Sequence, residues 1–298
     1  MTLDLDGFVA RIAAAFPDLA FSRAVLIDRG ADHAVVVLDD AWVFRFPRSA
    51  AYAATFPIEL KLLRALRSRT PLAIPDYLRV APRQAFGGYP LIVGRELTAP
   101  MFASLSRAAQ ETLLADLAAF MTALHDLPVD CVTGDDTVVK TDAGWAAEGA
   151  QSYFERRRPR VAEAVGPVTL RRLDRAHEDL PSLAWRRDAV IHGDLHDAHL
   201  LLDPAEDRLT GVIDFGDTAF GDAAHDFTFF WMLAGWTADF ALDRYGRAVD
   251  RAGVLHRSRW SFVRYGVGRL TLALRRGQAI AAADIIEALV AALHALDL

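Results

Sequence analysis

The fold is decided by the stretch Val190-Ile191-His192-Gly193-Asp194-Leu195-His196-Asp197-Ala198-His199-Leu200-Leu201-Leu202-Asp203, which Val212-Ile213-Asp214-Phe215-Gly216-Asp217 follows soon after. In both segments, an apolar run typical of a strand ends in a polar turn that carries acidic residues. One such turn is common in α/β proteins, and so is an isolated Asp-Phe-Gly. The order and spacing of the two together indicate a chemical site.

The two turns resemble the catalytic and metal loops of protein kinases, where H-x-D precedes a metal-binding side chain by five residues and Asp-Phe-Gly comes later. His192 and Asp194 match H-x-D, His199 stands five residues after Asp194, and Asp214 opens Asp-Phe-Gly. The resemblance implies that Asp194 orients or deprotonates an acceptor hydroxyl. It also implies that His199 and Asp214 hold Mg²⁺ against nucleotide phosphates, although imidazole is a softer ligand than magnesium usually prefers.

The wider pattern is similar to the aminoglycoside phosphotransferase family, through His-Gly-Asp-Leu-His, Leu-Leu-Leu-Asp and Gly-Val-Ile-Asp-Phe-Gly-Asp, and through residues 42–48 and 89–94. Histidine at the second metal position resembles the branch that includes the 2''-aminoglycoside and macrolide phosphotransferases. The resemblance implies a two-lobed, protein-kinase-like α+β fold. Residues 1–93 would form a small antiparallel-sheet N-lobe, and residues 94–298 a mainly helical C-lobe.

Composition narrows the class of protein. The chain has 298 residues with 53% hydrophobic content, which is enough for two lobes. A net charge of -6 argues against a nucleic-acid partner. The single Cys131 excludes an intrachain disulfide, the acidic start is no signal sequence, and the apolar run 227–236 is about half a bilayer span. We expect a cytoplasmic monomer with no membrane partner.

Three apolar segments at 24–27, 34–38 and 42–46 predict an antiparallel meander in the first lobe. The loop at 28–33 lies where kinases cover the nucleotide phosphates. Gly30 is its only glycine, so the loop lacks a G-x-G-x-x-G pattern. We predict that Gly30 covers the nucleotide, with an ordinary hairpin loop as the alternative.

The phosphate-binding lysine of kinases has no counterpart at the expected strand. The chain contains only Lys61 and Lys140, and neither fits a central strand of the first lobe. Arg45 lies between two phenylalanines in an alternating strand, and arginine binds phosphate oxygens through parallel hydrogen bonds. The macrolide branch of the family also tends to have arginine here. Arg48 remains the alternative, and either residue could be a solvated surface arginine.

The kinase analogy supplies further nucleotide contacts. Glu59, in a helix predicted over 58–66, would pair with Arg45, although a glutamate on a helix is usually solvated. Backbone groups near Leu91 and Val93 would face the nucleotide base. Gly87-Gly88 predicts a hairpin turn before that strand.

The second half of the chain is predicted to be mostly helical. Periodic apolar residues indicate a core helix over 113–124. Further helices are expected at 153–180, from 227, and at 239–252, 258–275 and 281–296, the last three walling the acceptor pocket. His192 is expected to support the catalytic loop, His125 to be a capping or core residue, and Asp226 to tie down a helix start. His196 is left between turn structure and the rim of the site.

Four residues are candidates for acceptor binding. Asp217 could join the metal shell or meet the acceptor. Trp231, Trp236 and Asp239 follow in the region where aminoglycoside-modifying relatives tend to carry acids. Because Asp239 is the single acid in that segment, an apolar pocket would better suit a macrolide or another partly apolar acceptor. Core packing is the alternative for both tryptophans.

We therefore predict a Mg²⁺-dependent enzyme that moves the γ-phosphate of ATP or GTP to a small-molecule hydroxyl, with an aminoglycoside- or macrolide-type antibiotic as acceptor. The missing Ala-Pro-Glu motif disfavours a protein kinase. Two alternatives stay open. One is a metabolite kinase acting on an amino alcohol or sugar. The other is a non-catalytic nucleotide-binding pseudokinase, which the absent lysine and the glycine-poor loop would suit.

Overall fold

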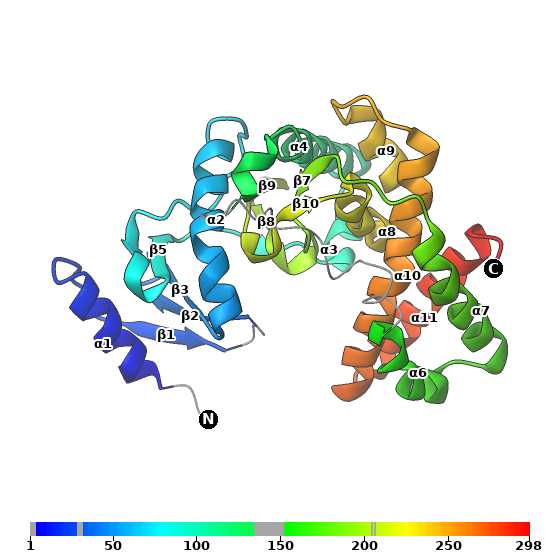
Figure 1. Cartoon of the computed structure of the whole chain (residues 1–298), viewed down its shortest axis with the longest axis horizontal. Coiled ribbons are helices and arrows are strands. Elements are labelled where there is room, and N and C mark those ends of the chain that lie inside the picture. The colour runs from blue at the N-terminus through cyan, green and yellow to red at the C-terminus, as the bar shows by residue number, and fades with distance from the viewer. Residues whose placement is uncertain (1–3, 29–31, 134–151, 204, 206) are drawn as a thin grey trace.

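The computed structural model describes residues 4–28, 32–133, 152–203, 205 and 207–298. An antiparallel sheet with two helices forms one end of the molecule, and helices dominate the other (Figure 1). The sheet end contains α1 Leu5–Ala15, β1 Ala24–Ile27, β2 His33–Leu38, β3 Trp42–Pro47, α2 Ala50–Leu66, β4 Arg79–Ala81 and β5 Phe86–Pro90. The chain then continues through β6 Arg95–Glu96, α3 Ala99–Ser104 and α4 Arg107–His125.

The helical end carries the two polar turns that contain Asp194 and Asp214 next to short strands. After α6 Arg158–Ala164 and α7 Pro167–Asp179 come β7 Ala189–Ile191, β8 Leu200–Asp203, β9 Arg208–Val212 and β10 Ala219–Gly221. The chain ends with α8 Phe230–Leu233, α9 Thr237–Arg244, α10 Arg251–Arg275 and α11 Ala279–Ala295. β7 pairs with β10, and β8 pairs with β6 and β9. These pairings bring the ends of β7 and β9, with their polar turns, to the same region.

The first sheet has the antiparallel order β1-β2-β3-β5-β4, as the predicted meander requires. Successive side chains of a strand point to opposite faces. Phe44 and Phe46 of β3 are fully buried on the face that α1 covers through Ile12 and Phe16. Arg45 lies between them in sequence and therefore points the other way, toward α2. The alternation that buries two phenylalanines thus aims the arginine at the interior of the molecule.

The glycines at 87 and 88 do not form the predicted hairpin turn. They lie inside β5, and the connection to β4 is the 3-10 turn η1 Pro82–Gln84 followed by Ala85 at φ 51°. A Cβ on Gly88 would lie 2.4 Å from the ring of Phe44, and one on Gly87 would lie 2.8 Å from the carbonyl oxygen of Arg79. Both glycines are therefore required by close packing within the sheet.

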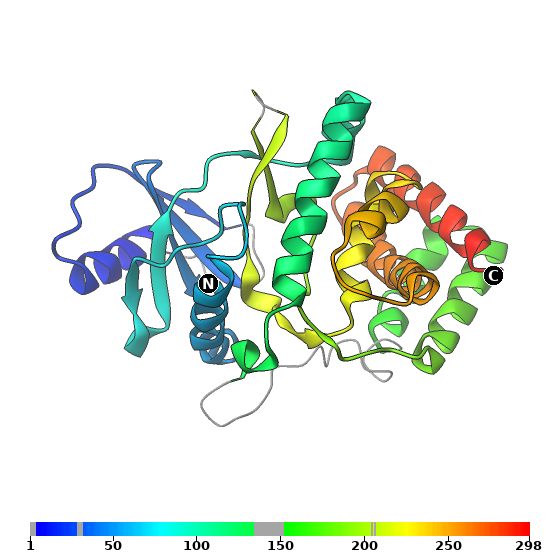
Figure 2. The same ribbon diagram turned by 90° about the horizontal axis from the view of Figure 1, so that it is seen from above.

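The helical end has two apolar cores. One surrounds α4 and includes Leu117, Phe120 and Leu124. The other joins α7, α10 and α11 through residues such as Leu173, Val267 and Leu289. Seen from above, α4 runs between the sheet end and the bundle of α10 and α11 (Figure 2). The α+β prediction is therefore confirmed.

Several predicted helix boundaries were wrong. The helix expected from 58 begins at Ala50, because Ser49 caps it by accepting a hydrogen bond from the Tyr52 N–H. The helix expected over 153–180 is interrupted between α6 and α7, where Gly166 precedes Pro167 at the first helical position. The helix expected over 239–252 ends at Arg244, and α10 begins at Arg251.

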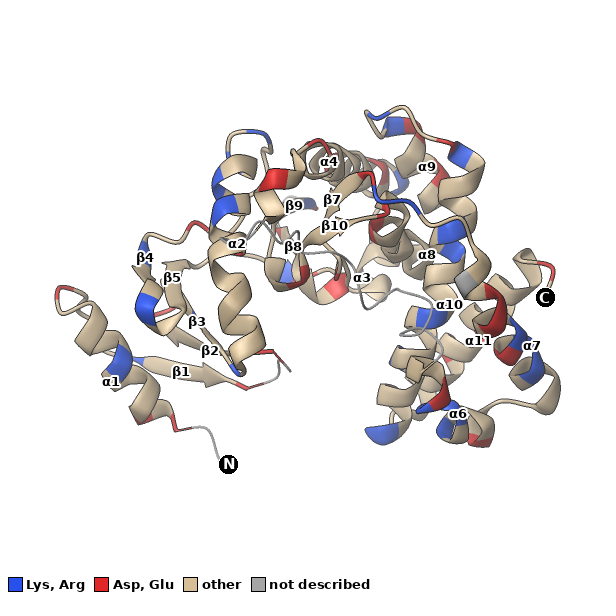
Figure 3. Cartoon of the chain, viewed as in Figure 1, with Lys and Arg blue, Asp and Glu red and all other residues tan. Residues whose placement is uncertain are grey.

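Acidic and basic residues are interspersed over the helical end (Figure 3). Arg158 pairs with Asp174 at 2.6 Å and Arg251 pairs with Asp239 at 2.8 Å, both at exposed positions where ion pairs contribute little stability. No helix within the described ranges is both long enough and apolar enough to cross a membrane.

Candidate functional site

The turn after β7 is held in place by the side chain of His192 and by the backbone conformation of Gly193. His192 is buried, and its Nε2 lies 3.1 Å from the carbonyl oxygen of Ile213, which links the first polar turn to the second. Gly193 has φ +81°, and a Cβ there would lie 2.5 Å from the carbonyl oxygen of Asp217. Only glycine fits both demands. Burial lowers the pKa of His192 to about 4, so the ring is neutral at pH 7 and supports the loop as predicted.

A buried carboxylate, that of Asp226, binds the backbone N–H groups of this turn. Asp226 accepts hydrogen bonds from the N–H groups of His192 at 2.7 Å and Gly193 at 3.0 Å. The ring of His125 lies 2.9 Å from the same carboxylate and 2.6 Å from the hydroxyl of Tyr245. The expectation that Asp226 ties down a helix start was therefore wrong. The available signal was an acid directly before the apolar run 227–236, where burial demands a partner.

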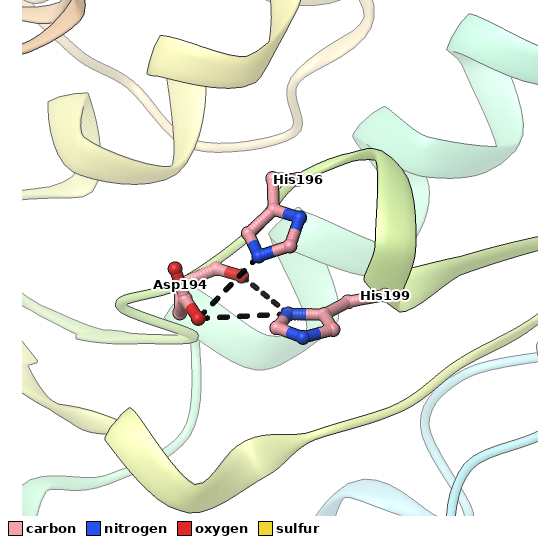
Figure 4. Close-up of side chains that lie close together, drawn as sticks. All are labelled: Asp194, His196 and His199. Atoms are coloured by element: carbon pink, nitrogen blue, oxygen red, sulfur yellow. Dashed lines mark hydrogen bonds and ion pairs between the residues drawn. The ribbon is translucent and has the colours of Figure 1, made fainter. Parts of the chain in front are cut away.

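Asp194 projects from the end of the turn beside two imidazoles (Figure 4). Its Oδ2 lies 3.5 Å from Nε2 of His196 and 3.8 Å from Nδ1 of His199. Burial would raise the pKa of Asp194, but the hydrogen bond and charge of His196, with the charge of His199, hold it below its usual value. Asp194 is thus an ionised acceptor at pH 7, with 40% of its side chain exposed.

The second turn presents Asp214 at φ 66°, directly after β9. Its Oδ2 lies 3.5 Å from Nε2 of His199, and its Oδ1 forms an ion pair with Arg45. Burial would raise the pKa of Asp214, but the charges of Arg45 and His199 outweigh it and hold that pKa well below its usual range. The structure therefore brings Arg45 of the sheet end together with Asp194, His199 and Asp214 of the helical end.

The donor set at Asp214 and His199 fits a divalent cation. The 3.5 Å between Oδ2 and Nε2 is longer than the roughly 2.9 Å between neighbouring ligands of octahedral magnesium, so a small side-chain movement would let both atoms bind one ion. Nδ1 of His199 lies 2.8 Å from the carbonyl oxygen of Asp194. A proton on Nδ1 leaves the lone pair of Nε2 facing Asp214. Because Asp214 is 43% exposed, water and phosphate oxygens can reach the remaining positions.

Arg45 is buried with only 4% of its side chain exposed, and its guanidinium is held on two sides. Nη1 donates to Glu59 Oε1 at 2.6 Å and to the Tyr77 hydroxyl at 3.3 Å. Nη2 faces Asp214 and lies 3.3 Å from Nδ1 of His33. Tyr77 and His33 had no distinguishing signal in the sequence. Their contacts with Arg45 arise only when β2, which carries His33, and the segment between α2 and β4, which carries Tyr77, pack around β3.

The alternative arginine lies elsewhere. Arg48 forms an ion pair with Asp28 near the surface and not with Glu59 or Asp214. The structure thus places Arg45, and not Arg48, beside Glu59 and Asp214. Gly30, the predicted nucleotide-covering glycine, lies outside the described residues.

The predicted base-facing segment follows β5 without regular structure. The N–H of Leu91 donates to the carbonyl oxygen of Ala41 at 2.8 Å, so this group is already engaged within the sheet end. Val93 has 76% of its side chain exposed. A Cβ on Gly94 would lie 2.6 Å from Oγ1 of Thr210, so the connection runs closely against β9. This segment is the passage between the two ends of the molecule.

Three cavities are lined by the last helices, and two of them also reach the turn after β7. One of about 470 Å³ is mostly apolar, with walls from α8, α10 and α11, and Asp197, Arg269 and Asp284 also line it. An adjoining one of about 310 Å³ reaches His196. A third of about 500 Å³ is lined by Trp231, whose ring lies under the guanidinium of Arg259. All three cavities have walls on α10 and α11, whereas residues 239–252, the third segment expected to wall the acceptor pocket, line none of them.

The other predicted acceptor residues are placed differently. Asp217 is exposed on η6 Phe215–Asp217, with its backbone against Gly193. Trp236 packs against Phe102 and Phe240, and Asp239 pairs with Arg251. Trp236 and Asp239 line none of these three cavities. For Trp236 the structure favours the packing alternative.

Comparison with known proteins agrees with this arrangement. A model of the phosphotransferase enzyme family matches residues 23–263. The aminoglycoside 3'-phosphotransferase of Streptomyces fradiae is 34% identical over 113 residues, which are 37% of this chain. That match spans 40% of the relative's own length.

Solved structures share the fold over nearly the whole chain. The GDP and kanamycin complex of APH(2'')-IIIa has a TM-score of 0.76 at 24% identity and covers 96% of this chain and 98% of its own. Macrolide 2'-phosphotransferase type I has a TM-score of 0.62 at 24% identity, covering 97% and 99%. At these identities the likeness concerns the fold, and it confirms the two-lobed architecture expected from the sequence.

Proposed function

The chain belongs to the phosphotransferase enzyme family, and from this premise we propose that it transfers the γ-phosphate of ATP or GTP to a hydroxyl of a small molecule. The observation that carries the proposal is the convergence of Asp194, His199, Asp214 and Arg45 at one site. Phosphoryl transfer depends on positioning the acceptor and on neutralising phosphate charge, and these four side chains supply both.

Asp194 is proposed to act on the acceptor. Its lowered pKa keeps it ionised, and its exposed oxygen can accept the hydrogen bond of a hydroxyl in the adjoining space. A carboxylate in this position orients the nucleophile and takes its proton as the bond to phosphorus forms. The proton then leaves with the product or passes to water.

His199 and Asp214 are proposed to hold Mg²⁺, which would neutralise phosphate charge when bound. Arg45 stays charged and would reach the same phosphates through its guanidinium fork, with Glu59 keeping it in place. This arrangement needs no lysine. It therefore removes the main reason for considering a pseudokinase.

The acceptor is proposed to be an antibiotic of the aminoglycoside or macrolide type, because similar proteins carry those names. The cavity beside Asp197 has an apolar wall formed by Met232, Phe262 and Ile285. Such a wall suits an acceptor with apolar surface better than a small polycation. Among the two classes, the wall favours a macrolide-like acceptor.

The test is release of nucleoside diphosphate by the full chain, with ATP and GTP in separate assays and with a panel of aminoglycosides and macrolides. We expect release that depends on one acceptor class and falls about 100-fold or more in Asp194→Asn. Asp179→Asn, on the exposed surface of α7, serves as the matched control. Near-normal turnover in Asp194→Asn would remove that residue from its role.

Two outcomes would redirect the proposal. Release with an amino alcohol or sugar, and no resistance when the gene is expressed in a sensitive host, would favour a metabolite kinase. Nucleotide binding without release for any acceptor would favour a non-catalytic module.

We further propose that the enzyme acts as a monomer in the cytoplasm, where nucleoside triphosphates are supplied.

A further inference from the structure

The described part of the chain contains one cluster of three side chains with the composition of a transition-metal site. It consists of Asp194, His196 and His199, whose ligand atoms all lie within 4.8 Å of one another (Figure 4). We propose that this cluster binds a zinc-class cation, separately from the magnesium pair at His199 and Asp214. One carboxylate and two imidazoles form a donor set that suits zinc better than magnesium.

The distances within the cluster are close to those of a zinc site. Oδ2 of Asp194 lies 3.5 Å from Nε2 of His196 and 3.8 Å from Nδ1 of His199. Neighbouring ligands of tetrahedral zinc are about 3.3 Å apart, given bonds of about 2.0–2.1 Å. Small side-chain movements would therefore close the site. The 40% exposure of Asp194 leaves access for the cation and for a water in the fourth position.

His196 has the outer partner that ligating histidines usually have. Its Nδ1 lies 3.2 Å from Oδ1 of Asp197, and that carboxylate accepts hydrogen bonds from Arg269 of α10 at 3.0 and 3.4 Å. Zinc binding would displace the Nε2 proton that bonds to Asp194, and the remaining ring proton on Nδ1, toward Asp197, would leave the lone pair of Nε2 for the cation. Arg269 and Asp197 are far apart in sequence, so the sequence alone gave no sign of this support.

His199 can serve only one of the two cations. Without zinc, Nδ1 donates to the carbonyl oxygen of Asp194 at 2.8 Å, and Nε2 faces Asp214. Zinc on Nδ1 requires the proton to lie on Nε2, which then cannot ligate a cation shared with Asp214. Zinc would also occupy the carboxylate proposed to act on the acceptor. If the proposed phosphotransfer is correct, the zinc-bound form is inactive.

The binding test uses Zn²⁺ alone, with neither nucleotide nor acceptor, so its result does not depend on the proposed reaction. Zinc affinity is measured by competition with a chromophoric zinc indicator. We expect His196→Gln to bind zinc at least 10-fold more weakly than the wild type, and Asp197→Asn about 10-fold more weakly. His294→Gln, at an exposed position on the last turn of α11, should match the wild type.

Asp214→Asn separates the new site from the magnesium pair. It should weaken zinc binding by no more than about 10-fold, because Asp214 does not belong to the cluster and would serve only as an outer partner that accepts the Nε2–H of His199. Equal zinc affinity in the wild type and His196→Gln would overturn the proposal. An Asp214→Asn loss clearly larger than that of His196→Gln would assign the zinc to the magnesium pair instead.

The functional arm measures nucleoside diphosphate release at fixed Mg²⁺ with increasing Zn²⁺. Zinc should inhibit the wild type, and His196→Gln should need at least 10-fold more zinc for the same inhibition. Equal inhibition of the two proteins would overturn the inhibitory role. An enzyme that shows no turnover at all, yet binds zinc through His196, would refute the proposed reaction and leave the metal site standing.

Discussion

At the scale of single residues, Arg45 shows how a strand arginine can stand where kinases have lysine. The two terminal nitrogens of its guanidinium face different partners, Glu59 on one side and Asp214 on the other. A lysine ammonium is a point charge on a flexible stem and cannot span both in a fixed plane. The sequence could offer Arg45 and Arg48 as alternatives. Choosing between them required the positions of α2 and the second turn.

Replacing Arg45 by lysine tests this reasoning. Arg45→Lys keeps the charge but loses one charge-assisted hydrogen bond, which is worth about 1.5–3 kcal/mol. We expect kcat/KM for the nucleotide to fall by roughly 10- to 100-fold, measured by initial rates at saturating acceptor. Arg48→Lys should stay close to the wild type, since Arg48 pairs with Asp28. Equal losses in both variants would contradict the assignment.

At the scale of elements, the sequence identified most strands and helices but misplaced their ends. Short apolar runs and helical periodicity are local signals, and they sufficed to predict β1–β3 and α4. The glycines at 87 and 88 look like a turn in the sequence. In the structure their lack of a side chain makes room for Phe44 and Tyr77. Such a steric role depends on a neighbouring strand, so no local pattern could reveal it.

Gly88→Ala tests the packing role of β5. The added Cβ would lie 2.4 Å from the ring of Phe44, which is fully buried. Overpacking of this kind typically costs about 1–3 kcal/mol. We expect the free energy of unfolding, from chemical denaturation, to fall by that amount. Gly235→Ala, where a Cβ would meet nothing within 4 Å, should change it by less than about 0.5 kcal/mol.

The catalytic turn shows what the motif could and could not reveal. Its spacing predicted that Asp194, His199 and Asp214 converge, and the structure brings them together. The clamp by Asp226 and His125 escaped prediction, because the contact joins residues 101 apart in sequence. Motif residues can be recognised by their chemical type and spacing. The residues that hold them in place are recognised only once the packing is known.

At the scale of the whole molecule, the site lies where the sheet end and the helical end meet. We propose that the lobes divide near residue 93, where the chain leaves β5 and passes closely over β9. Arg45 comes from the first lobe and Asp194, His199 and Asp214 from the second, so relative movement of the lobes would change the Arg45–Asp214 contact. The proposed acceptor preference rests on the cavity walls of α8, α10 and α11, which motif spacing does not encode.

Buried histidines make the fold sensitive to acid. His177 stacks on Phe154, and burial lowers its pKa from 6.5 to about 4. Between these values the unfolded chain binds a proton that the folded chain does not, so stability falls as the pH falls from 6.5 to 4. We expect this residue to account for up to about 3 kcal/mol of the loss.

The matched variants are His177→Gln and His294→Gln, compared by chemical denaturation across this pH range. His177→Gln should flatten the dependence relative to the wild type, whereas His294→Gln at the exposed end of α11 should leave it unchanged. A steep acid loss that persists unchanged in His177→Gln would show that other groups carry it.

The measurement that tests the central claim most directly is the transfer of labelled γ-phosphate from ATP or GTP to the acceptor, followed on the isolated acceptor and not only as nucleotide turnover. The account predicts a phosphorylated aminoglycoside or macrolide with the wild type, and a yield lower by about 100-fold or more with Asp194→Asn while nucleotide affinity is kept. Label that reaches only water, or equal phosphorylation by Asp194→Asn, would contradict it.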